Sequence, residues 1–199
     1  MHSLKDKFDE VCLRIGEGRR LESTGSDPIF YLVFPAEEIL DVKRLTPAWI
    51  AKLENQGWKV STFSMAEEIN ALFLGHKLRP QWLLGEKMLL DTANRRGTPP
   101  DYREINKTLT KAVIEGGDLL ARLKERLAET SASPDGLLLL TDLEALHPYL
   151  RINSIEAQLQ NQVHCPVIVL YPGVREGKTS LKFLGFYPAD PNYRSEHIG

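Results

Sequence analysis

Four short apolar runs stand out along the chain and predict buried β-strands. They are Ile29–Phe34, Trp58–Phe63, Leu137–Thr141 and Val167–Tyr171. Their β-branched, aromatic and leucine residues suit strands that are covered on both faces, so we expect each run to be central or nearly central in its sheet. An alternating segment that begins at Ser180, SLKFLGFYP, is predicted to be the last strand.

No strand pattern occurs between Met65 and Thr130, and helical spacing fills this segment instead. Ser64, followed three residues later by Glu67, is typical of a helix N-cap. We interpret residues 65–130 as a helical insertion within one domain that spans residues 1–199. Buried strands that alternate with helices indicate a three-layer α/β fold with a central, mostly parallel sheet.

Helices are also predicted outside the insertion. Residues 4–15 carry apolar side chains at three- and four-residue spacing. Pro47 is predicted to open a helix that ends before Gly57, because proline is tolerated in a first turn and glycine favours a helix end. A further helix is expected from about Ser154 to Gln162.

Composition narrows the protein class. The 199 residues are 42% apolar and 26% charged, which suits a globular domain, and the net charge of -2 argues against a dedicated nucleic-acid coat. Only two cysteines occur, Cys12 and Cys165, which are interpreted as reduced thiols. No apolar run approaches the roughly 20 residues that span a bilayer. We therefore expect a cytoplasmic protein without a membrane segment.

The stretch YPGVREGKTS, from Tyr171 to Ser180, resembles an ATP-binding loop. A Walker loop needs four residues between its glycine and the Gly-Lys pair, whereas Gly173 and Gly177 are separated by three. A Walker loop also enters a helix, but the residues after Lys178 alternate like a strand. This stretch is therefore predicted to be a hairpin connection that binds no nucleotide.

A second resemblance to ATPases lies in LLLLTDLE, where an apolar strand ends at Asp142 as a Mg²⁺-binding Walker B strand would. The interpretation we favour is a capping box, in which Thr141 and Glu144 begin a helix. The five histidines show no paired metal-ligand spacing. We predict no catalytic residue, no cofactor and no metal, and hence a protein that is not an enzyme.

The segment from His76 to Glu115 is basic, with eight Lys or Arg against five Asp or Glu. One interpretation is a helical surface for nucleic acid or for an acidic partner. The other is an ordinary solvated helix face, which we favour.

The chain resembles the BrxB family, a core component of bacteriophage-exclusion (BREX) systems. The resemblance is carried by HPYLR after the third strand, PVIVLYPG, LKFLG and the closing YR..HI, with YLVFPAEEI and GGDLLARL upstream. It implies a role in phage defence beside a methyltransferase, a large ATPase and PglZ, an alkaline-phosphatase-like protein. It supplies no catalytic motif.

The residues and the resemblance together predict a non-catalytic protein that binds other BREX proteins, a PglZ-like protein foremost. Arg151, Tyr193 and Arg194 are the candidate partner-binding residues, because Tyr and Arg are enriched at binding hot spots. Arg151 could instead anchor the tail internally. A degenerate phosphate-loop fold would explain a Walker B-like strand without a working loop in such a non-catalytic protein. Two alternatives stay open: a nucleotide-binding regulator that uses Asp142 and Lys178, or a nucleic-acid module that uses the basic segment.

Overall fold

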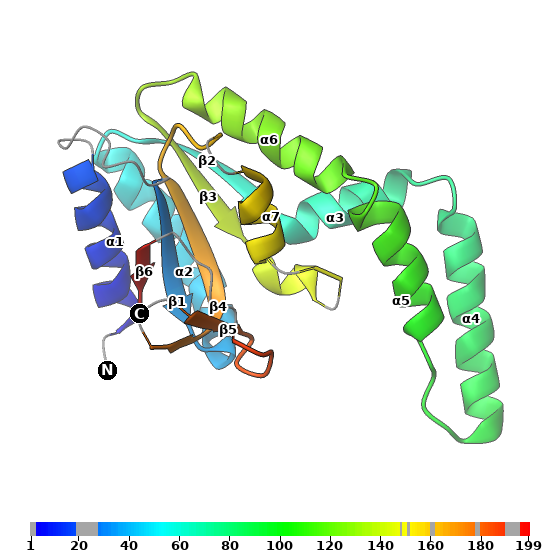
Figure 1. Cartoon of the computed structure of the whole chain (residues 1–199). Coiled ribbons are helices and arrows are strands. Elements are labelled where there is room, and N and C mark those ends of the chain that lie inside the picture. The colour runs from blue at the N-terminus through cyan, green and yellow to red at the C-terminus, as the bar shows by residue number, and fades with distance from the viewer. Residues whose placement is uncertain are drawn as a thin grey trace.

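A central sheet with helices on both of its faces forms the body of the protein (Figure 1). The structure is a computed structural model and describes residues 3–18, 28–147, 149–150, 152–159, 162–177, 180–189 and 196–199. The parallel strands run in the order β2-β3-β4-β1-β6, and β5 pairs antiparallel with β4. This confirms the predicted α/β class with a mostly parallel sheet. The strands are β1 (Ile29–Phe34), β2 (Lys59–Ser64), β3 (Gly136–Thr141), β4 (Val167–Glu176), β5 (Ser180–Phe183) and β6 (Glu196–Ile198).

Two strand predictions were wrong. β2 lies at the edge of the sheet rather than near its centre, and Phe63 is its only fully buried residue. Trp58, which made the run look more apolar, is buried but precedes the strand. The segment after Ser180 is not the last strand, because β6 follows it and pairs with β1, with His197 opposite Tyr31. Three residues with two polar side chains carry no strand pattern of their own.

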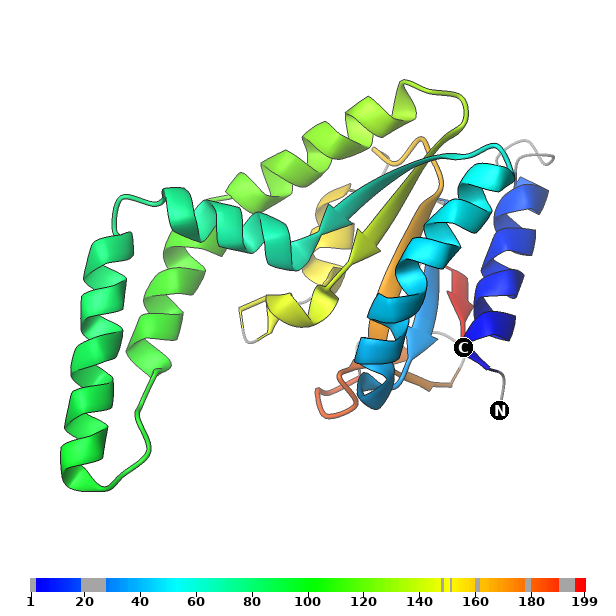
Figure 2. The same ribbon diagram turned by 180° about the vertical axis from the view of Figure 1, so that it is seen from behind.

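Helices cover both faces of the sheet. α1 and α2 pack on one face, and α6 and α7 pack on the other (Figures 1 and 2). Two short 3₁₀ turns, η1 and η3, follow β1 and β3, and a π-helical turn, η2, follows α5. The bounds are α1 (Leu4–Gly18), η1 (Ala36–Glu38), α2 (Ile39–Asn55), α3 (Met65–Gly75), α4 (Arg79–Arg96), α5 (Arg103–Leu109), η2 (Thr110–Ile114), α6 (Asp118–Ser131), η3 (Leu143–Leu146) and α7 (Ile152–Leu159).

The helix around Pro47 begins earlier than predicted. α2 starts at Ile39, so Pro47 lies inside the helix rather than opening it. Proline removes one main-chain donor, and the helix is nevertheless held to the sheet by the buried Trp49 and Leu53. The described part of α7 spans Ile152–Leu159, so this helix includes two residues before its predicted start at Ser154. The N-cap prediction is confirmed, because the Ser64 hydroxyl accepts a hydrogen bond of 3.2 Å from the Glu67 amide.

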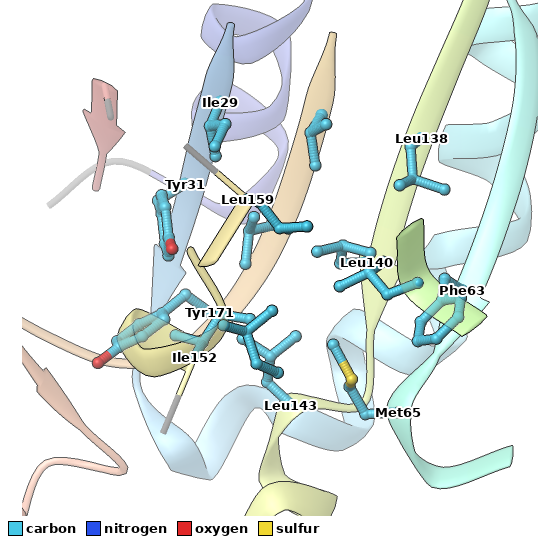
Figure 3. Packing of buried hydrophobic residues seen from close by; sticks show 14 of the residues in the cluster. Ile29, Tyr31, Phe63, Met65, Leu138, Leu140, Leu143, Ile152, Leu159 and Tyr171 are labelled. Atoms are coloured by element: carbon cyan, nitrogen blue, oxygen red, sulfur yellow. The ribbon is translucent and has the colours of Figure 1, made fainter. Parts of the chain in front are cut away.

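The core consists of one apolar layer on each face of the sheet, because successive strand residues point to opposite faces. Leu32 and Leu139 face α1 and α2, where the rings of Phe8 and Trp49 stack with centroids 4.6 Å apart. Figure 3 shows the other layer, in which Tyr31 and neighbouring strand residues pack beneath α7. Residues of this layer include Ile29, Phe63, Met65, Leu138, Leu140, Leu143, Ile152, Leu159 and Tyr171.

The helices α4 and α5 form an arm that projects from the body (Figures 1 and 2). α3 and α6 lead to and from this arm at the β2–β3 end of the molecule. Four α-helices and the π-helical turn η2 thus lie between β2 and β3. Within the described part of the chain, no helix is both long and apolar enough to cross a bilayer.

Candidate functional site

A polar cluster forms at the carboxyl ends of β2 and β3, where α/β folds commonly bind ligands. Asp142 follows β3 directly and has a left-handed backbone conformation, with φ of 56°. Its Oδ2 accepts hydrogen bonds from the hydroxyls of Ser64, at 2.6 Å, and Thr141, at 2.9 Å. Lys43 of α2 places its Nζ 2.7 Å from Asp142 Oδ1 and 2.7 Å from Glu144 Oε1. Both oxygens of the Asp142 carboxylate therefore have partners from this chain.

Electrostatics keep the cluster ionised. Burial alone would raise the pKa of Asp142, but the hydrogen bonds from Lys43, Ser64 and Thr141 hold it below its usual value. Burial alone would lower the pKa of Lys43, but its hydrogen bonds to Asp142 and Glu144 raise it. The ammonium group thus offsets part of the negative charge of the two carboxylates. No group of three potential metal ligands occurs among the described residues.

The capping-box interpretation of this segment is wrong. The Thr141 hydroxyl donates a hydrogen bond to the Asp142 carboxylate and does not cap a helix. Asp142 occupies the N-cap position, and its side chain makes no capping hydrogen bond. The turn that follows is the short 3₁₀ turn η3 and not an α-helix. The left-handed backbone of Asp142 accounts for the difference, because it redirects the chain before a capping geometry can form.

A cluster of aromatic side chains lies beside the polar cluster. Nδ1 of His147, just after η3, shares a hydrogen bond with the hydroxyl of Tyr187. The ring of Phe186 packs 4.8 Å from that of Tyr187 and 5.6 Å from His147, and its side chain is 65% exposed. Phe183 of β5 contacts the ring of Tyr187 and also the buried ring of Tyr171, in tilted arrangements. His147 at the end of η3 and the residues that follow β5 are thereby brought together.

The stretch from Tyr171 to Ser180, which resembles an ATP-binding loop, connects β4 and β5 as a hairpin, as predicted. β4 continues to Glu176, which pairs with Ser180 of antiparallel β5, and no helix follows. A Cβ on Gly173 would lie 2.3 Å from the Lys182 carbonyl oxygen, so this glycine allows close approach of the two strands. Gly177 has φ of +72°, which supplies the left-handed turn geometry. Lys178 lies outside the described residues.

The three residues predicted to bind a partner, Arg151, Tyr193 and Arg194, also lie outside the described residues. Their neighbours are placed: Ile152 is buried at the start of α7, and β6 begins at Glu196 beside β1. The prediction that these side chains form one surface is not tested by the structure.

Comparison with protein families adds the identity that the geometry leaves open. The family model described as BREX protein BrxB matches residues 82–198, which is more than half of the chain. This chain belongs to the BrxB family. Searches among curated proteins and among solved structures found no match. BrxB membership makes this protein a component of a BREX phage-defence system and confirms the resemblance inferred from the sequence.

The residues that match the BrxB model include the acids of the polar cluster and all residues of the aromatic cluster. Asp142, Glu144, His147 and Tyr187 fall within the matched residues, whereas Lys43 precedes them. Sequence reasoning singled out Asp142 but missed Lys43, because no local pattern joins two residues so far apart. The sequence did not predict the pairing of His147 with Tyr187 either, although both residues lie in or next to segments that carry the BrxB resemblance.

The BrxB-matched region also forms part of an apolar groove that sequence reasoning missed. The groove has a volume of about 340 Å³ and lies where α3, η2 and η3 meet. Tyr149 contributes a polar group, and burial raises the pKa of its hydroxyl. The π-helical turn η2 forms one wall, and such turns frequently occur at functional sites. The lining residues are Ala66, Ile69, Asn70, Phe73, Leu109, Ile114, Ala145 and Tyr149.

Proposed function

We propose that this protein is a non-catalytic BREX component that acts by binding other defence proteins, with a PglZ-like protein as its main partner. Family membership supplies the system. The observation that carries the non-catalytic part is the bond between Lys43 and Asp142. An acid that binds a metal ion works best without a competing cation, and the Lys43 ammonium already pairs with Oδ1 of Asp142 while Ser64 and Thr141 bond Oδ2.

The connection after β1 supports the same proposal. In phosphate-loop proteins, glycines and a lysine cradle the phosphates where the first strand leads into its helix. Here that connection runs from Pro35 through η1, and it contains Glu37 and Glu38 but neither glycine nor lysine. Two carboxylates at this position repel a phosphate group. We therefore propose a degenerate phosphate-loop fold in which residues 65–130 form a helical insertion of a single domain.

A nucleotide-binding regulator is the second candidate function. The observation that favours it is the position of Asp142 at the carboxyl end of a buried strand. For nucleotide binding, Lys43 would have to release this carboxylate. The Lys43→Met variant would then bind nucleotide more tightly than the parent protein, which gives the two candidates opposite expectations.

A pull-down of this protein against each other product of its defence operon tests the main proposal. We expect a stoichiometric complex with at least one product, the PglZ-like protein foremost, and no thermal shift with ATP and Mg²⁺. The same thermal-shift measurement on the Lys43→Met variant tests the second candidate function, which expects this variant to bind nucleotide more tightly than the parent. If no complex forms and ATP raises the melting temperature, the main proposal fails. Nucleotide binding is then the better-supported function.

A further inference from the structure

The arm exposes apolar side chains that nothing in the described residues covers. On α4, Leu84 is 60% exposed and Met88 is 62% exposed, one helical turn apart. Leu83 and Leu90 are also exposed, at 42% and 39%. Exposed apolar residues gathered on one helix are typical of interaction sites, whereas scattered single ones are not.

The exposure is not caused by a loosely attached helix. Trp82 at the start of α4 is buried, and its ring stacks on those of Phe73 and His76 at centroid distances of 5.7 Å and 4.6 Å. Farther along α4, a Cβ atom added to Gly85 would lie 3.7 Å from Cδ1 of Ile105 in α5, so the two helices are in contact here. α4 thus uses one side to pack on α3 and α5 and presents Leu84 and Met88 away from that packing.

Charge distinguishes the arm from the rest of the molecule. Residues 79–109, from the start of α4 to the end of α5, carry six Lys or Arg and four Asp or Glu, a net charge of +2 in a chain whose total is -2. The remaining residues therefore carry a net charge of -4. Arg103 is neutralised by Asp101, but Lys87 and Arg96 on α4 make no ion pair with any described residue. α4 alone carries four Lys or Arg against the two acids Glu86 and Asp91, so this helix has a net charge of +2.

We propose that the outer face of α4, centred on Leu84 and Met88 with Lys87 and Arg96 on the same helix, binds an acidic amphipathic helix of a partner defence protein. An amphipathic helix matches apolar side chains at four- and seven-residue spacing, and methionine adapts readily to such a partner. Acidic residues on that helix would complement the charge of the arm. A nucleic acid fits less well, because its interfaces are polar and would leave Leu84 and Met88 unmatched.

This inference rests on the proposed function, and the test separates the two. Each operon product that forms a complex is titrated with the parent protein, with the double variant Leu84→Ser plus Met88→Ser, and with a matched control, Leu13→Ser plus Leu40→Ser. The control residues are 61% and 64% exposed on α1 and α2, so all four leucine and methionine sites have similar exposure. We expect the arm variant to weaken binding about ten-fold or more and the control to leave it unchanged.

The charge component has its own variant. Lys87→Glu plus Arg96→Glu should weaken the same complex, and increasing salt should weaken the parent complex more than that of this variant. Cross-linking followed by mass spectrometry should map the contact on the partner to a segment with net negative charge and helical apolar spacing. A contact segment that is neutral or basic would overturn the proposal.

The other outcomes are equally decisive. If a complex forms and the arm variant binds as tightly as the parent, the α4 face is not the docking surface, although the proposed function stands. If no operon product binds the parent protein, the proposed function and this inference fail together. If duplex DNA of mixed sequence binds and only the charge variant reduces that binding, the arm is a nucleic-acid surface instead.

Discussion

The Nζ atom of Lys43 lies 2.7 Å from Oδ1 of Asp142 and joins helix α2 to the end of strand β3. The Asp142 side chain is 19% exposed, and Ser64 of β2 and Thr141 of β3 bond its other oxygen. The acid thus connects both strands with α2. The positive charge beside this carboxylate therefore comes from the chain itself.

Replacing Lys43 with Met is expected to lower the free energy of unfolding by roughly 1–3 kcal/mol, because it leaves a partly buried carboxylate without its cation. Urea denaturation measures the change. Lys5→Met, at an exposed lysine of α1, is the control and should change stability by less than about 0.5 kcal/mol. Unchanged stability of Lys43→Met would mean that solvent screens the pair completely.

The same pair fixes a pH dependence. The pKa of Asp142 is below its usual 3.8 and that of Lys43 is above its usual 10.5. The contribution of the pair should therefore be constant at intermediate pH. It should be lost as the pH falls below 3.8 through the lowered pKa of Asp142, or rises above 10.5 through the raised pKa of Lys43. The difference in stability between parent and Lys43→Met should vanish at both extremes.

A second pH effect is expected from His197 in β6. Its side chain is buried, and burial, together with the charge of Arg175, lowers its pKa from 6.5 to about 4. The unfolded chain binds a proton at higher pH than the folded one, so stability should be full above pH 6.5 and decrease as the pH falls toward 4. The loss should amount to roughly 2–4 kcal/mol across this window.

His197→Gln should flatten this part of the pH profile, measured as urea midpoints at closely spaced pH values. His164→Gln provides the matched control, because His164 is exposed. An equal slope in all three proteins would show that His197 does not titrate differently in the folded and unfolded states.

The sequence predicted correctly those elements whose structure depends on neighbouring residues in the chain, and it failed where distant residues decide. β3 was predicted correctly, because four consecutive leucines in a short run suit a strand buried on both faces. β6 was missed because its strand character comes from pairing with β1 and not from its own three residues. The apolar spacing of α4 was visible, but only the packing of α3 and α5 decides that Leu84 faces outward. Lys43 left no local signal at all.

Leu139→Asp should prevent soluble folding. Leu139 is completely buried in β3, beside β2 and β4. An unpaired carboxylate there costs several kcal/mol, a large fraction of the roughly 5–15 kcal/mol that stabilises a domain. The soluble fraction after expression and the cooperativity of unfolding measure the outcome. Leu40→Asp, at a 64% exposed site, should remain soluble, and a cooperatively folding Leu139→Asp protein would contradict the buried position.

The β4–β5 hairpin gives two contrasting expectations. Gly173→Ala should destabilise the protein by about 1–3 kcal/mol, because the added Cβ would meet the Lys182 carbonyl and the Tyr171 ring at 2.3 Å and 2.6 Å. Lys178→Ala should leave both stability and defence nearly unchanged. Thermal melts and phage plating measure these effects. Micromolar ATP binding that Lys178→Ala abolishes would instead show that the hairpin binds nucleotide.

Arg151 and Tyr193 are predicted to contact a partner, and the prediction extends to Arg194. His147, the first residue of the HPYLR segment, is bonded to Tyr187 beside the exposed Phe186. Arg151→Ala and Tyr193→Ala should weaken the complex with a defence protein while stability stays within about 0.5 kcal/mol of the parent. Both are measured on purified proteins, by titration and by denaturation. If both changes cost more than roughly 1–2 kcal/mol of stability and leave the complex intact, Arg151 anchors the tail internally, and the partner binds elsewhere, with the outer face of α4 as the next surface to test.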